Sequence, residues 1–590
     1  MSHHKPDPSK SVNLTIDGLP VTVPEGTTIL EAARKLGIYI PVLCDHPDLH
    51  KRAVCRICVV ECDGGGKLKA ACANDVWEGV KVVTNSPKIQ AIRKTIVELI
   101  LADHPQDCLT CIRNQKCELQ ALAIQFGLKE LTFPKADVVS RPNIDTNTLV
   151  RDMAKCVKCG RCVDVCQEIQ GVKAINTAHR SVAYEITTPY DQELIEGPCV
   201  YCGQCAAVCP VGAIYENDQT DTVWKAIDDP ERHVVVQTAP AVRVALGDEF
   251  GLPKGAITTG KMATALRRLG FTKVFDTDWS ADVTILEEGN ELLHRLKNGG
   301  KLPMITSCSP GWINFCEVFY PDLLGHLSTC KSPQQMFGAL VKTYYPKISG
   351  VDPSKISSVS IMPCTAKKFE AQRPEMNSSG FQDVDVVLTT RELARMIKLA
   401  GLDFAMLPET PFDQLMGDST GAAVIFGTSG GVMEAALRTV YEVVTGEALA
   451  PLDLEAVRGH QGLKTVDVDL KGTKVKIMVA NGLANARLVM DSIREGKCDA
   501  TFIEIMCCPG GCVGGGGQPY GNSQIKLQRK DGLYQADQAL PIRKSHDNPE
   551  VKALYENYLG QPLGEKSHHL LHTHYSSSGK NHWAKAGHQG

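Results

Sequence analysis

The pattern of apolar and polar side chains changes along the chain and marks regions of different structure. Residues 12–23 alternate apolar and polar side chains around Asp17-Gly18, which predicts a two-stranded hairpin. A helix is expected to follow from Thr27, where a threonine precedes an apolar stripe. Residues 86–126 carry isoleucines at helical spacing, so we expect a helical segment there.

From about residue 228 onward, short β-branched runs alternate with helical patterns. Strands are expected at residues 234–236, 283–285 and 359–361, with a helix at 261–269. This alternation predicts α/β layers around a mostly parallel sheet. The tail from residue 576 is rich in Ser, Gly and His, and we expect it to be disordered.

Length and charge exclude several classes of protein. A chain of 590 residues is long enough for several domains. Its formal net charge of −4 offers no basic surface for nucleic acid. The absence of a run of about 18 apolar residues predicts that no segment spans a membrane. The first residues lack the apolar stretch of a secretory signal, so we predict a cytoplasmic protein.

Cysteine is the residue whose placement changes this picture. The chain has 24 cysteines, and sixteen of them precede residue 210 in tight groups. In the reducing cytoplasm such spacing favours metal ligation over disulfide bonds.

The first group has the spacing Cys44-x10-Cys55-x2-Cys58-x13-Cys72. Four thiolates satisfy the two irons of a 2Fe–2S cluster, although the same donors also suit tetrahedral zinc. We favour the cluster, because this spacing beside a hairpin and a helix start resembles the ferredoxin-like domain of complex I and hydrogenase subunits. Cys62 lies between the ligands and is interpreted as a simple thiol.

The second group is His104-x3-Cys108-x2-Cys111-x5-Cys117. Three cysteines leave one iron of a 4Fe–4S cubane without a ligand, and the histidine is placed to bind it. A neutral imidazole in place of a thiolate should alter the potential of the cluster. A lone histidine is more often structural, but its position before a cysteine triplet favours ligation.

The third group is a duplicated motif, and it is the most specific local signal in the sequence. Both copies have the spacing of bacterial two-cluster ferredoxins, in which each run gives three ligands to one 4Fe–4S cluster and its fourth ligand to the other. Cys209 is therefore expected to complete the first set and Cys166 the second. The two runs are Cys156-x2-Cys159-x2-Cys162-x3-Cys166 and Cys199-x2-Cys202-x2-Cys205-x3-Cys209.

Three further cysteine segments follow in the C-terminal part. Each places cysteine beside Pro or Gly, where a turn admits a bulky cofactor close to the backbone. Taken singly, each is compatible with a buried thiol at a turn. The segments are Thr306-Ser307-Cys308-Ser309-Pro310, then Met362-Pro363-Cys364 with Lys367 and Glu370, and Met506-Cys507-Cys508 with Gly511-Cys512. Together and in this order they resemble the three signatures of FeFe hydrogenases.

The resemblance extends from residue 12 to about 575 and is similar in particular to multi-cluster catalytic subunits of the clostridial and NAD(P)-linked type. It implies reversible H2 oxidation and proton reduction at an H-cluster, a 4Fe–4S cubane joined to a two-iron azadithiolate unit with CO and CN ligands. One 2Fe–2S and three accessory 4Fe–4S clusters would relay electrons. The implied multidomain α+β and α/β fold has a β-grasp domain (12–84), a helical His/Cys domain (85–126), a two-cluster ferredoxin domain (145–220), an α/β H-cluster domain (228–575) and a flexible tail (576–590).

The resemblance also implies roles for residues around the H-cluster. Cys364, Cys508 and Cys512 match cubane ligands, and Cys512 matches the one that bridges to the two-iron unit. Lys367 matches a lysine that hydrogen-bonds a cyanide; read without the family, it would be a surface lysine. The remaining matches line the pocket: they are Met362, Met506 and Gln334.

A proton route can be carried over in the same way. Glu288 and Glu291 match relay carboxylates, with Ser328 between them and the cluster and Arg295 at the outer end. Without the resemblance, this segment would be interpreted only as the charged beginning of a helix. The innermost donor in the family is a cysteine, which here corresponds to Cys308.

The sequence departs from the family at three positions. The family has adjacent cysteines in the first signature, the first for protons and the second for the cubane, whereas this chain has Cys308 followed by Ser309. Cys308 is therefore predicted either to donate protons or to bind the cubane, with the two roles left open. Cys507 stands where the family has a small residue and is expected to be a nearby free thiol. Ala241 replaces a serine that contacts a cyanide.

Two alternative functions fit parts of the sequence. A complex I-like electron-transfer subunit explains the N-terminal motifs but not Cys364, Cys508 and Cys512. A hydrogen-sensing relative is compatible with the altered first signature, although no sensory segment is evident. Because no nucleotide site is visible, the expected partners are the flavoprotein and 2Fe–2S subunits of an NAD(P)-linked complex, or ferredoxin. Maturation proteins would be needed to build the H-cluster.

Overall fold

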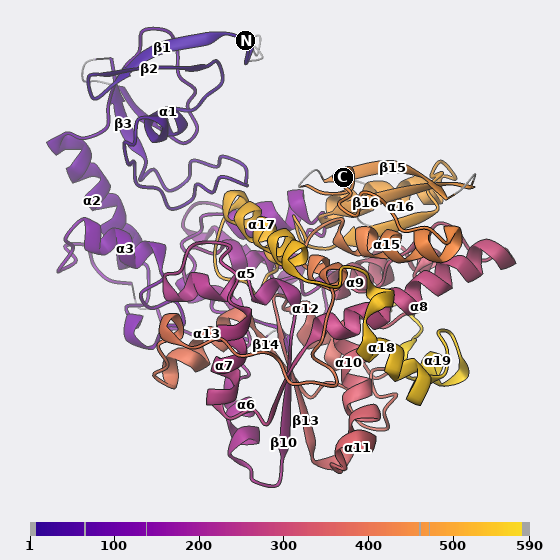
Figure 1. Ribbon diagram of the computed structural model, residues 1–590. Coiled ribbons are helices and arrows are strands. Elements are labelled where there is room, and N and C mark those ends of the chain that lie inside the picture. The colour runs from indigo at the N-terminus through magenta and orange to yellow at the C-terminus, as the bar shows by residue number, and fades with distance from the viewer. Residues whose placement is uncertain are drawn as a thin grey trace.

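The computed structural model describes residues 7–63, 67–136, 138–144, 146–459, 462–470 and 473–580. Figure 1 shows a small N-terminal part beside a larger body that contains the C-terminal two thirds of the chain. No helix of the described residues is long and apolar enough to cross a membrane. Most of the predicted tail, residues 581–590, lies outside the described residues; residues 576–580 follow the body, where the Lys580 ammonium donates to the Tyr201 hydroxyl at 3.3 Å.

The N-terminal part is a five-stranded sheet with one helix. The predicted hairpin is confirmed: β1 (Ser11–Ile16) pairs antiparallel with β2 (Leu19–Pro24). The turn residues Asp17 and Gly18 both have positive φ, +50° and +81°, as a tight hairpin of this type requires. The predicted helix is α1 (Ile29–Lys35), which Thr28 and Glu31 begin with a reciprocal capping box. The remaining strands of the order β2-β1-β5-β3-β4 are β3 (Val59–Cys62), β4 (Lys67–Ala70) and β5 (Lys81–Val83).

The predicted helical segment after this sheet consists of two helices. They are α2 (Pro87–Ala102) and α3 (Glu118–Gln125), and the cysteines of the second group occupy the turn between them. Ser86 begins α2, because its hydroxyl accepts from the Ile89 N–H at 3.2 Å.

The duplicated cysteine motif forms two similar loop-and-helix units. In each copy a glycine with positive φ, Gly160 (+82°) or Gly203 (+69°), directly precedes a short helix, α4 (Arg161–Asp164) or α5 (Gln204–Val208). The two copies are joined by the antiparallel strands β6 (Leu149–Arg151) and β9 (Ile214–Glu216). A second antiparallel pair, β7 (Asn176–Ala178) and β8 (Glu185–Thr187), lies between the copies in sequence.

The large body contains two four-stranded sheets, ordered β11-β10-β13-β14 and β12-β17-β16-β15. Every pairing is parallel except that of β15 with β16. The strands of the first sheet are β10 (His233–Thr238), β11 (Lys273–Asp276), β13 (Ile356–Met362) and β14 (Val386–Thr389). Those of the second are β12 (Met304–Ile305), β15 (Leu463–Leu470), β16 (Thr473–Asn481) and β17 (Phe502–Met506). The predicted α/β layering with a mostly parallel sheet is confirmed.

Helices cover both faces of the first sheet, as Figure 1 shows. Val234 and Val236 of β10 pack in one apolar cluster with α7 (Thr259–Leu269) and α13 (Thr390–Leu399). Val235, which points to the opposite face, packs with α8 (Thr277–Asn298) and α10 (Pro333–Val341). The other helices of the body are α6 (Thr220–Asp228), α9 (Pro310–Phe319), α11 (Tyr344–Ser349), α12 (Ala366–Ala371), α14 (Gly421–Val424), α15 (Gly431–Thr445), α16 (Leu483–Arg494), α17 (Ser523–Ala539), α18 (Pro549–Leu554) and α19 (Glu565–Leu571).

The predicted strand at residues 283–285 is wrong, because these residues lie inside the 22-residue helix α8. Asp276 begins that helix by accepting from the Asp278 N–H, and residues 277–285 are all buried. A helix that is buried on every side loses its polar face, so its short β-branched run resembles a core strand.

Arg438 of α15 provides a test of how the C-terminal helices are held together. Its fully buried guanidinium pairs with Glu434 at 2.7 Å and with Asp537 of α17 at 2.8 Å. Arg438→Met should lower the free energy of unfolding by about 3 kcal/mol, because it leaves buried carboxylates with fewer cations. Lys355→Met is the control, since Lys355 forms an exposed pair with Glu231 and should show no measurable change. Urea unfolding followed by circular dichroism compares the two variants, and equal shifts would contradict this account.

Candidate functional site

The three C-terminal cysteine segments each begin where a parallel strand ends. Cys308 follows β12, Cys364 follows β13, and Cys508 follows β17. The carboxyl ends of parallel strands are the usual place for ligands in α/β proteins, because loops and helix starts gather there. The topology therefore brings together segments that are up to 200 residues apart in sequence.

A cavity lies where these segments meet. Its walls come from the segment after β10, from the first residue of α8 and from all three cysteine segments. The lining residues are Ala239, Pro240, Thr277, Cys308, Ser309, Pro310, Pro333, Gln334, Met362, Pro363, Cys364, Lys367, Phe426, Met506, Cys507, Cys508, Gly511, Cys512 and Gly515. The structure thus places together the cysteines, methionines, Lys367 and Gln334 that the sequence predicted for the pocket, whereas Ala241 is not among the lining residues.

The thiols of Cys364, Cys508 and Cys512 line one region of this cavity. Loss of hydration raises the pKa of Cys512 to about 12 and also raises the pKa of Cys364. The pKa of Cys508 is lowered, chiefly by its contact with the Cys507 thiol. Positive charge, which iron supplies, would stabilise the thiolate form of these poorly hydrated cysteines. Three soft donors in a dry cavity fit the cubane part of an H-cluster.

Glycines keep the third cysteine loop close to its neighbours. A Cβ on Gly515 would lie 2.2 Å from the carbonyl oxygen of Pro363, which precedes Cys364. Gly511 has a φ of +91°, and a Cβ there would lie 2.5 Å from the Ser429 nitrogen. Only glycine fits these positions without a shift of the backbone, so the loop is held where its cysteines face the cavity.

A polar corner of the cavity is built around Lys367. Its ammonium donates to the Cys308 carbonyl at 3.2 Å and pairs with Glu370 at 2.8 Å. Gln334 donates to the Lys367 carbonyl at 3.3 Å and to Glu370 at 3.2 Å. The sequence assigned no role to Glu370, yet its carboxylate binds both Lys367 and Gln334. The alternative of a surface lysine is wrong, because Lys367 is only 9% exposed.

The predicted proton-route residues form a continuous line away from the cavity. The Ser328 hydroxyl donates to Glu291 at 2.8 Å, and the Arg295 guanidinium pairs with Glu291 at 2.6 Å. Burial and the nearby Glu291 raise the pKa of Glu288 to about 8, against hydrogen bonds with the Ser328 side chain and the Ser307 backbone. One Glu288 oxygen is buried without a hydrogen-bond partner in the part of the chain that the structure describes. The pKa of Cys308 is raised by burial and then by Glu288, which puts these two groups near each other.

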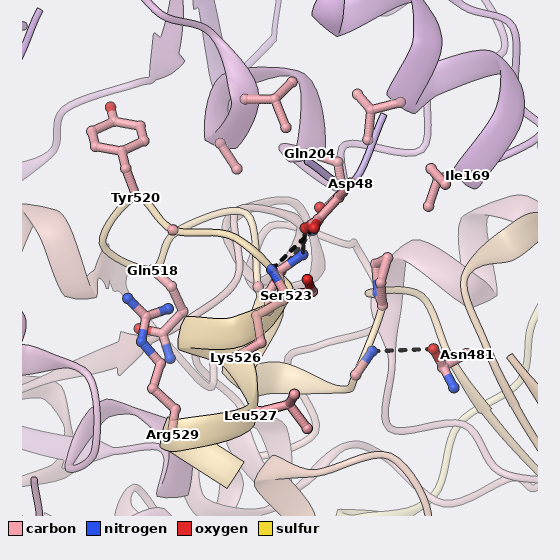
Figure 2. Close-up of a pocket in the computed structure, with 18 of the residues that line it drawn as sticks. Asp48, Ile169, Gln204, Asn481, Gln518, Tyr520, Ser523, Lys526, Leu527 and Arg529 are labelled. Atoms are coloured by element: carbon pink, nitrogen blue, oxygen red, sulfur yellow. Dashed lines mark hydrogen bonds and ion pairs between the residues drawn. The ribbon is translucent and has the colours of Figure 1, made fainter. Parts of the chain in front are cut away.

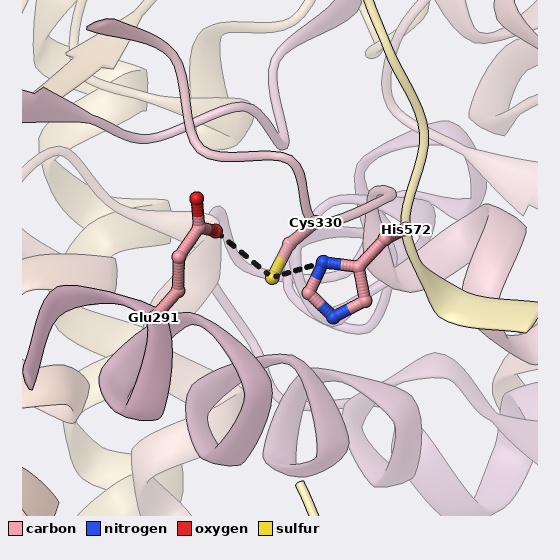
Figure 3. A group of neighbouring side chains, drawn as sticks. All are labelled: Glu291, Cys330 and His572. Carbon is pink, nitrogen blue, oxygen red and sulfur yellow. Dashed lines mark hydrogen bonds between the residues drawn. The ribbon is translucent and has the colours of Figure 1, made fainter. Parts of the chain in front are cut away.

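Sequence reasoning missed the side chains that surround the outer end of this line. Figure 3 shows Glu291 beside Cys330 and His572, with 3.7 Å from the Glu291 carboxylate to the Cys330 sulfur and 4.0 Å from that sulfur to His572 Nδ1. His572 Nε2 lies 3.1 Å from Glu287, which also accepts from the Tyr555 hydroxyl at 2.6 Å. His572 and Tyr555 are more than 250 residues from Glu287, and no local motif marks them.

The duplicated motif lines two separate cavities. One is lined by Cys156, Cys159, Cys162 and Cys209, and the other by Cys166, Cys199, Cys202 and Cys205. The structure therefore brings together the two exchanged sets that the spacing predicts.

The second of these cavities adjoins the second and third C-terminal segments. The Thr365 hydroxyl, next to Cys364, donates to the Tyr201 carbonyl at 2.7 Å. Gln204 donates to the Gly514 carbonyl at 2.9 Å, and a Cβ on Gly516 would lie 2.3 Å from the Cys202 carbonyl oxygen.

The first cysteine group is also assembled. The Cys58 and Cys72 sulfurs are 3.4 Å apart, and the Cys44 thiol contacts those of Cys55 and Cys72. Cys62 is buried in the apolar core of the sheet. His104 is buried, its pKa is lowered by loss of hydration, and its Nδ1 has no hydrogen-bond partner among the described residues. Cys108, Cys111 and Cys117 are half-buried around the turn that follows it.

A larger pocket lies behind the third cysteine loop, and Figure 2 shows it. Asp48, from the N-terminal part, accepts from the Ser523 N–H at 3.2 Å and pairs with Lys526 of α17 at 3.4 Å. On the opposite wall the Gly510 N–H donates to Asn481 at 3.1 Å. The pocket lies where the N-terminal part contacts the body, and it backs the loop that carries Cys508 and Cys512.

Comparison with known proteins decides the family. Residues 232–516 match the iron only hydrogenase large subunit, C-terminal domain, and residues 523–578 match the iron hydrogenase small subunit. The NADP-reducing hydrogenase subunit HndD of Solidesulfovibrio fructosivorans is 47% identical over 580 residues, which cover 96% of this chain and 98% of that protein. Iron hydrogenase 1 of Clostridium pasteurianum is 40% identical over 573 residues, 95% of this chain and 99% of that protein. The chain belongs to the FeFe hydrogenases.

Other comparisons agree with the motifs of this FeFe hydrogenase. Three N-terminal segments match a 2Fe–2S iron–sulfur cluster binding domain (9–87), the NADH-ubiquinone oxidoreductase-G iron–sulfur binding region (93–131) and a 4Fe–4S dicluster domain (155–213). An FeFe-hydrogenase structure described for stepwise H-cluster assembly superposes with a TM-score of 0.56 at 44% identity, covering 61% of this chain and 99% of that one. The protein is thus the catalytic subunit of an iron–sulfur oxidoreductase that acts on H2.

The raised pKa of Glu288 makes the predicted proton route testable. Glu288→Gln cannot take up and release a proton, so dye-linked H2 oxidation and evolution should both fall about 100-fold or more. Glu287→Gln is the matched control, because the Glu287 carboxylate is bound by Tyr555 and His572 instead. Iron content should be unchanged in both variants, and equal losses of activity would contradict the route.

The same carboxyl should titrate in infrared difference spectra. Because its pKa is raised to about 8, Glu288 is protonated below that pH and ionised above it. Wild-type protein should therefore show a protonated carboxyl at neutral pH that disappears as the pH rises through about 8. The Glu288→Gln variant should lack this signal, and its persistence there would assign the titration to another group.

Proposed function

We propose that this chain catalyses H2 oxidation and proton reduction at an H-cluster held by Cys364, Cys508 and Cys512, with Cys512 as the bridging ligand. The observation that carries the proposal is the meeting of these three thiols in one dry cavity, directly beside the cavity of Cys166, Cys199, Cys202 and Cys205. When bound, the H-cluster would supply the centre where two protons and two electrons are exchanged with H2. Met362, Met506 and Gln334 line the space beside it, and Lys367 offers an ammonium to its anionic ligands.

Protons would move along the line of Glu288, Ser328 and Glu291. Glu288 holds a proton on its carboxyl at neutral pH, and its unpartnered oxygen offers a place for exchange with the Cys308 side of the cavity. The Ser328 hydroxyl lies between the two carboxyls and can accept one proton while it donates another. Arg295 fixes Glu291 at the outer end of the line.

Electrons would pass through one 2Fe–2S cluster and three accessory 4Fe–4S clusters. In this proposal a β-grasp domain (12–84) holds the 2Fe–2S cluster on Cys44, Cys55, Cys58 and Cys72, and a helical domain (85–126) holds a cubane on His104, Cys108, Cys111 and Cys117. The unpartnered Nδ1 of buried His104 supports its role as a ligand. A ferredoxin domain (145–220) holds the other two clusters and leads to the hydrogenase domain (228–575).

The physiological electron partner is proposed from the relatives. One similar protein is described as NADP-reducing, which supports an NAD(P)-linked flavoprotein partner for this chain; ferredoxin is the alternative. The dense thiol ligands need a reducing compartment, so we also propose the cytoplasm.

Infrared spectroscopy tests the H-cluster directly. Matured protein should show carbon monoxide and cyanide bands together with H2 turnover. Protein made without maturation proteins should lack both, yet retain the visible and paramagnetic signals of its accessory clusters, because the relay ligands are separate from the H-cluster ligands. H2 evolution by the protein made without maturation would contradict the proposal.

The entry point of electrons can be tested with two buried cysteines of the N-terminal sheet. Cys58→Ser should remove the 2Fe–2S signal and lower partner-linked turnover at least 10-fold, while turnover with an artificial dye changes little. Cys62→Ser should change neither rate, because Cys62 packs in the apolar core. Equal losses of partner-linked and dye-linked activity in the Cys58 variant would argue against entry at this cluster.

A further inference from the structure

Two departures of this sequence from the hydrogenase pattern meet in space. Ser309 stands where the pattern has a cubane cysteine, and Cys507 is an additional cysteine before Cys508. The Cys507 N–H donates to the Ser309 hydroxyl oxygen at 3.2 Å, although the two residues are 198 positions apart in sequence. A serine hydroxyl is a poor ligand for this soft site, and this one already accepts a backbone hydrogen bond. The missing sulfur and the extra sulfur are therefore neighbours.

The side chain of Cys507 lies at the wall of the same cavity. The residue is only 4% exposed and belongs to the cavity lining with Cys364, Cys508 and Cys512. Gly311 leaves room for its sulfur, because a Cβ at that position would lie 2.7 Å from it. Its thiol contacts the thiols of Cys202 and Cys508. Cys507 thus presents a sulfur between the first and third cysteine segments.

Cys308, the other candidate for the fourth ligand, has different neighbours. The charges of Glu288 and Lys367 act most strongly on the Cys308 thiol. Among the cavity thiols, that of Cys512 acts on it. Its carbonyl is held by the Lys367 ammonium. Cys308 therefore lies on the side of the cavity that leads to the proton line, near the proposed bridging ligand.

The neighbouring ferredoxin cavity does not need the sulfur of Cys507. Cys166, Cys199, Cys202 and Cys205 already line that cavity, and four thiolates complete a 4Fe–4S cluster. The three thiols on the other side of Cys507 leave one cubane iron without a cysteine. Only the H-cluster cubane therefore requires a further sulfur ligand.

We propose that Cys507 supplies the fourth thiolate of the H-cluster cubane in this chain and that Cys308 keeps the role of proton donor. The inference rests on the proposed function, since it presumes a cubane in this cavity. Ligation forms one iron–sulfur bond as the thiol gives up its proton to solvent, with no change of oxidation state. The ligand sulfur would then contact Cys202, a ligand of the adjacent cluster, and this contact gives electrons a direct path into the cubane.

The test uses the full chain made without maturation proteins, so that it holds only iron–sulfur clusters. Iron content and Mössbauer and paramagnetic resonance spectra are compared for wild type, Cys507→Ala, Cys308→Ala and Cys316→Ala. Cys507→Ala should lose about four irons and one cubane signal while the accessory signals remain. Cys308→Ala should retain every cluster. Cys316→Ala, which removes a buried thiol bonded to the Tyr320 carbonyl, controls for the loss of any core sulfur and should also retain them.

A rescue variant keeps the proposal open to refutation if Cys507→Ala folds poorly. The double variant Ser309→Cys/Cys507→Ala restores the family arrangement and should recover the cubane. A normal cubane in Cys507→Ala, its loss in Cys308→Ala, or no recovery in a double variant that keeps its accessory clusters would each overturn the inference. If wild-type protein itself lacks this additional cubane, the proposed function fails first, so the two failures are distinguishable.

Discussion

The low hydration of the thiols around the central cavity is the constraint on which the hydrogenase domain depends. A thiol that loses its water resists ionisation, and the raised pKa of Cys364 and Cys512 expresses this cost. Iron removes the cost when it binds, because its positive charge replaces water as the partner of the thiolate. Before iron binds, other interactions in the protein must therefore hold these poorly hydrated thiols together. The packed strands β12, β13 and β17 do so, since each carries a cysteine segment directly beyond its buried end.

Buried charges attach the ferredoxin-like segment to the body of the protein. Arg391 of α13 pairs with Glu216 of β9 at 2.6 Å and also donates to the Gly516 and Gln518 carbonyls at 2.8 and 2.6 Å. One guanidinium thus joins the ferredoxin strand, a helix of the body and the third cysteine loop. The Arg391 and Arg395 guanidiniums hold the pKa of Glu216 well below its usual range despite burial. This buried cation fixes the spacing between the ferredoxin strand and the third cysteine loop.

The sequence predicted which cysteines of the duplicated motif come together, because this grouping depends on local spacing. The exchange of Cys166 and Cys209 between the two cavities follows from the duplicated motif alone, and the hairpin at Asp17-Gly18 follows from turn chemistry. Helix α8 was misjudged in part because a fully buried helix carries no polar stripe. Contacts across the fold were not predictable in the same way. Neither the bond between Cys507 and Ser309 nor the pairing of His572 with Glu287 has any local signal, because both depend on strand order and on the return of the C-terminal segment.

The proposed paths of protons and electrons lie on different sides of the cavity. The carboxyl of Glu288 and the ammonium of Lys367 lie on the Cys308 side, where a proton can be held on a neutral acid at ordinary pH. The Cys507 side is lined by sulfur and apolar groups and continues into the ferredoxin cavity through Cys202. A thiolate that is bound to iron carries no proton to pass on, whereas ligand sulfurs in contact can pass electrons. If Cys507 binds the cubane as proposed, a cysteine on the sulfur side and a serine in the first segment would leave the proton side of the cavity intact.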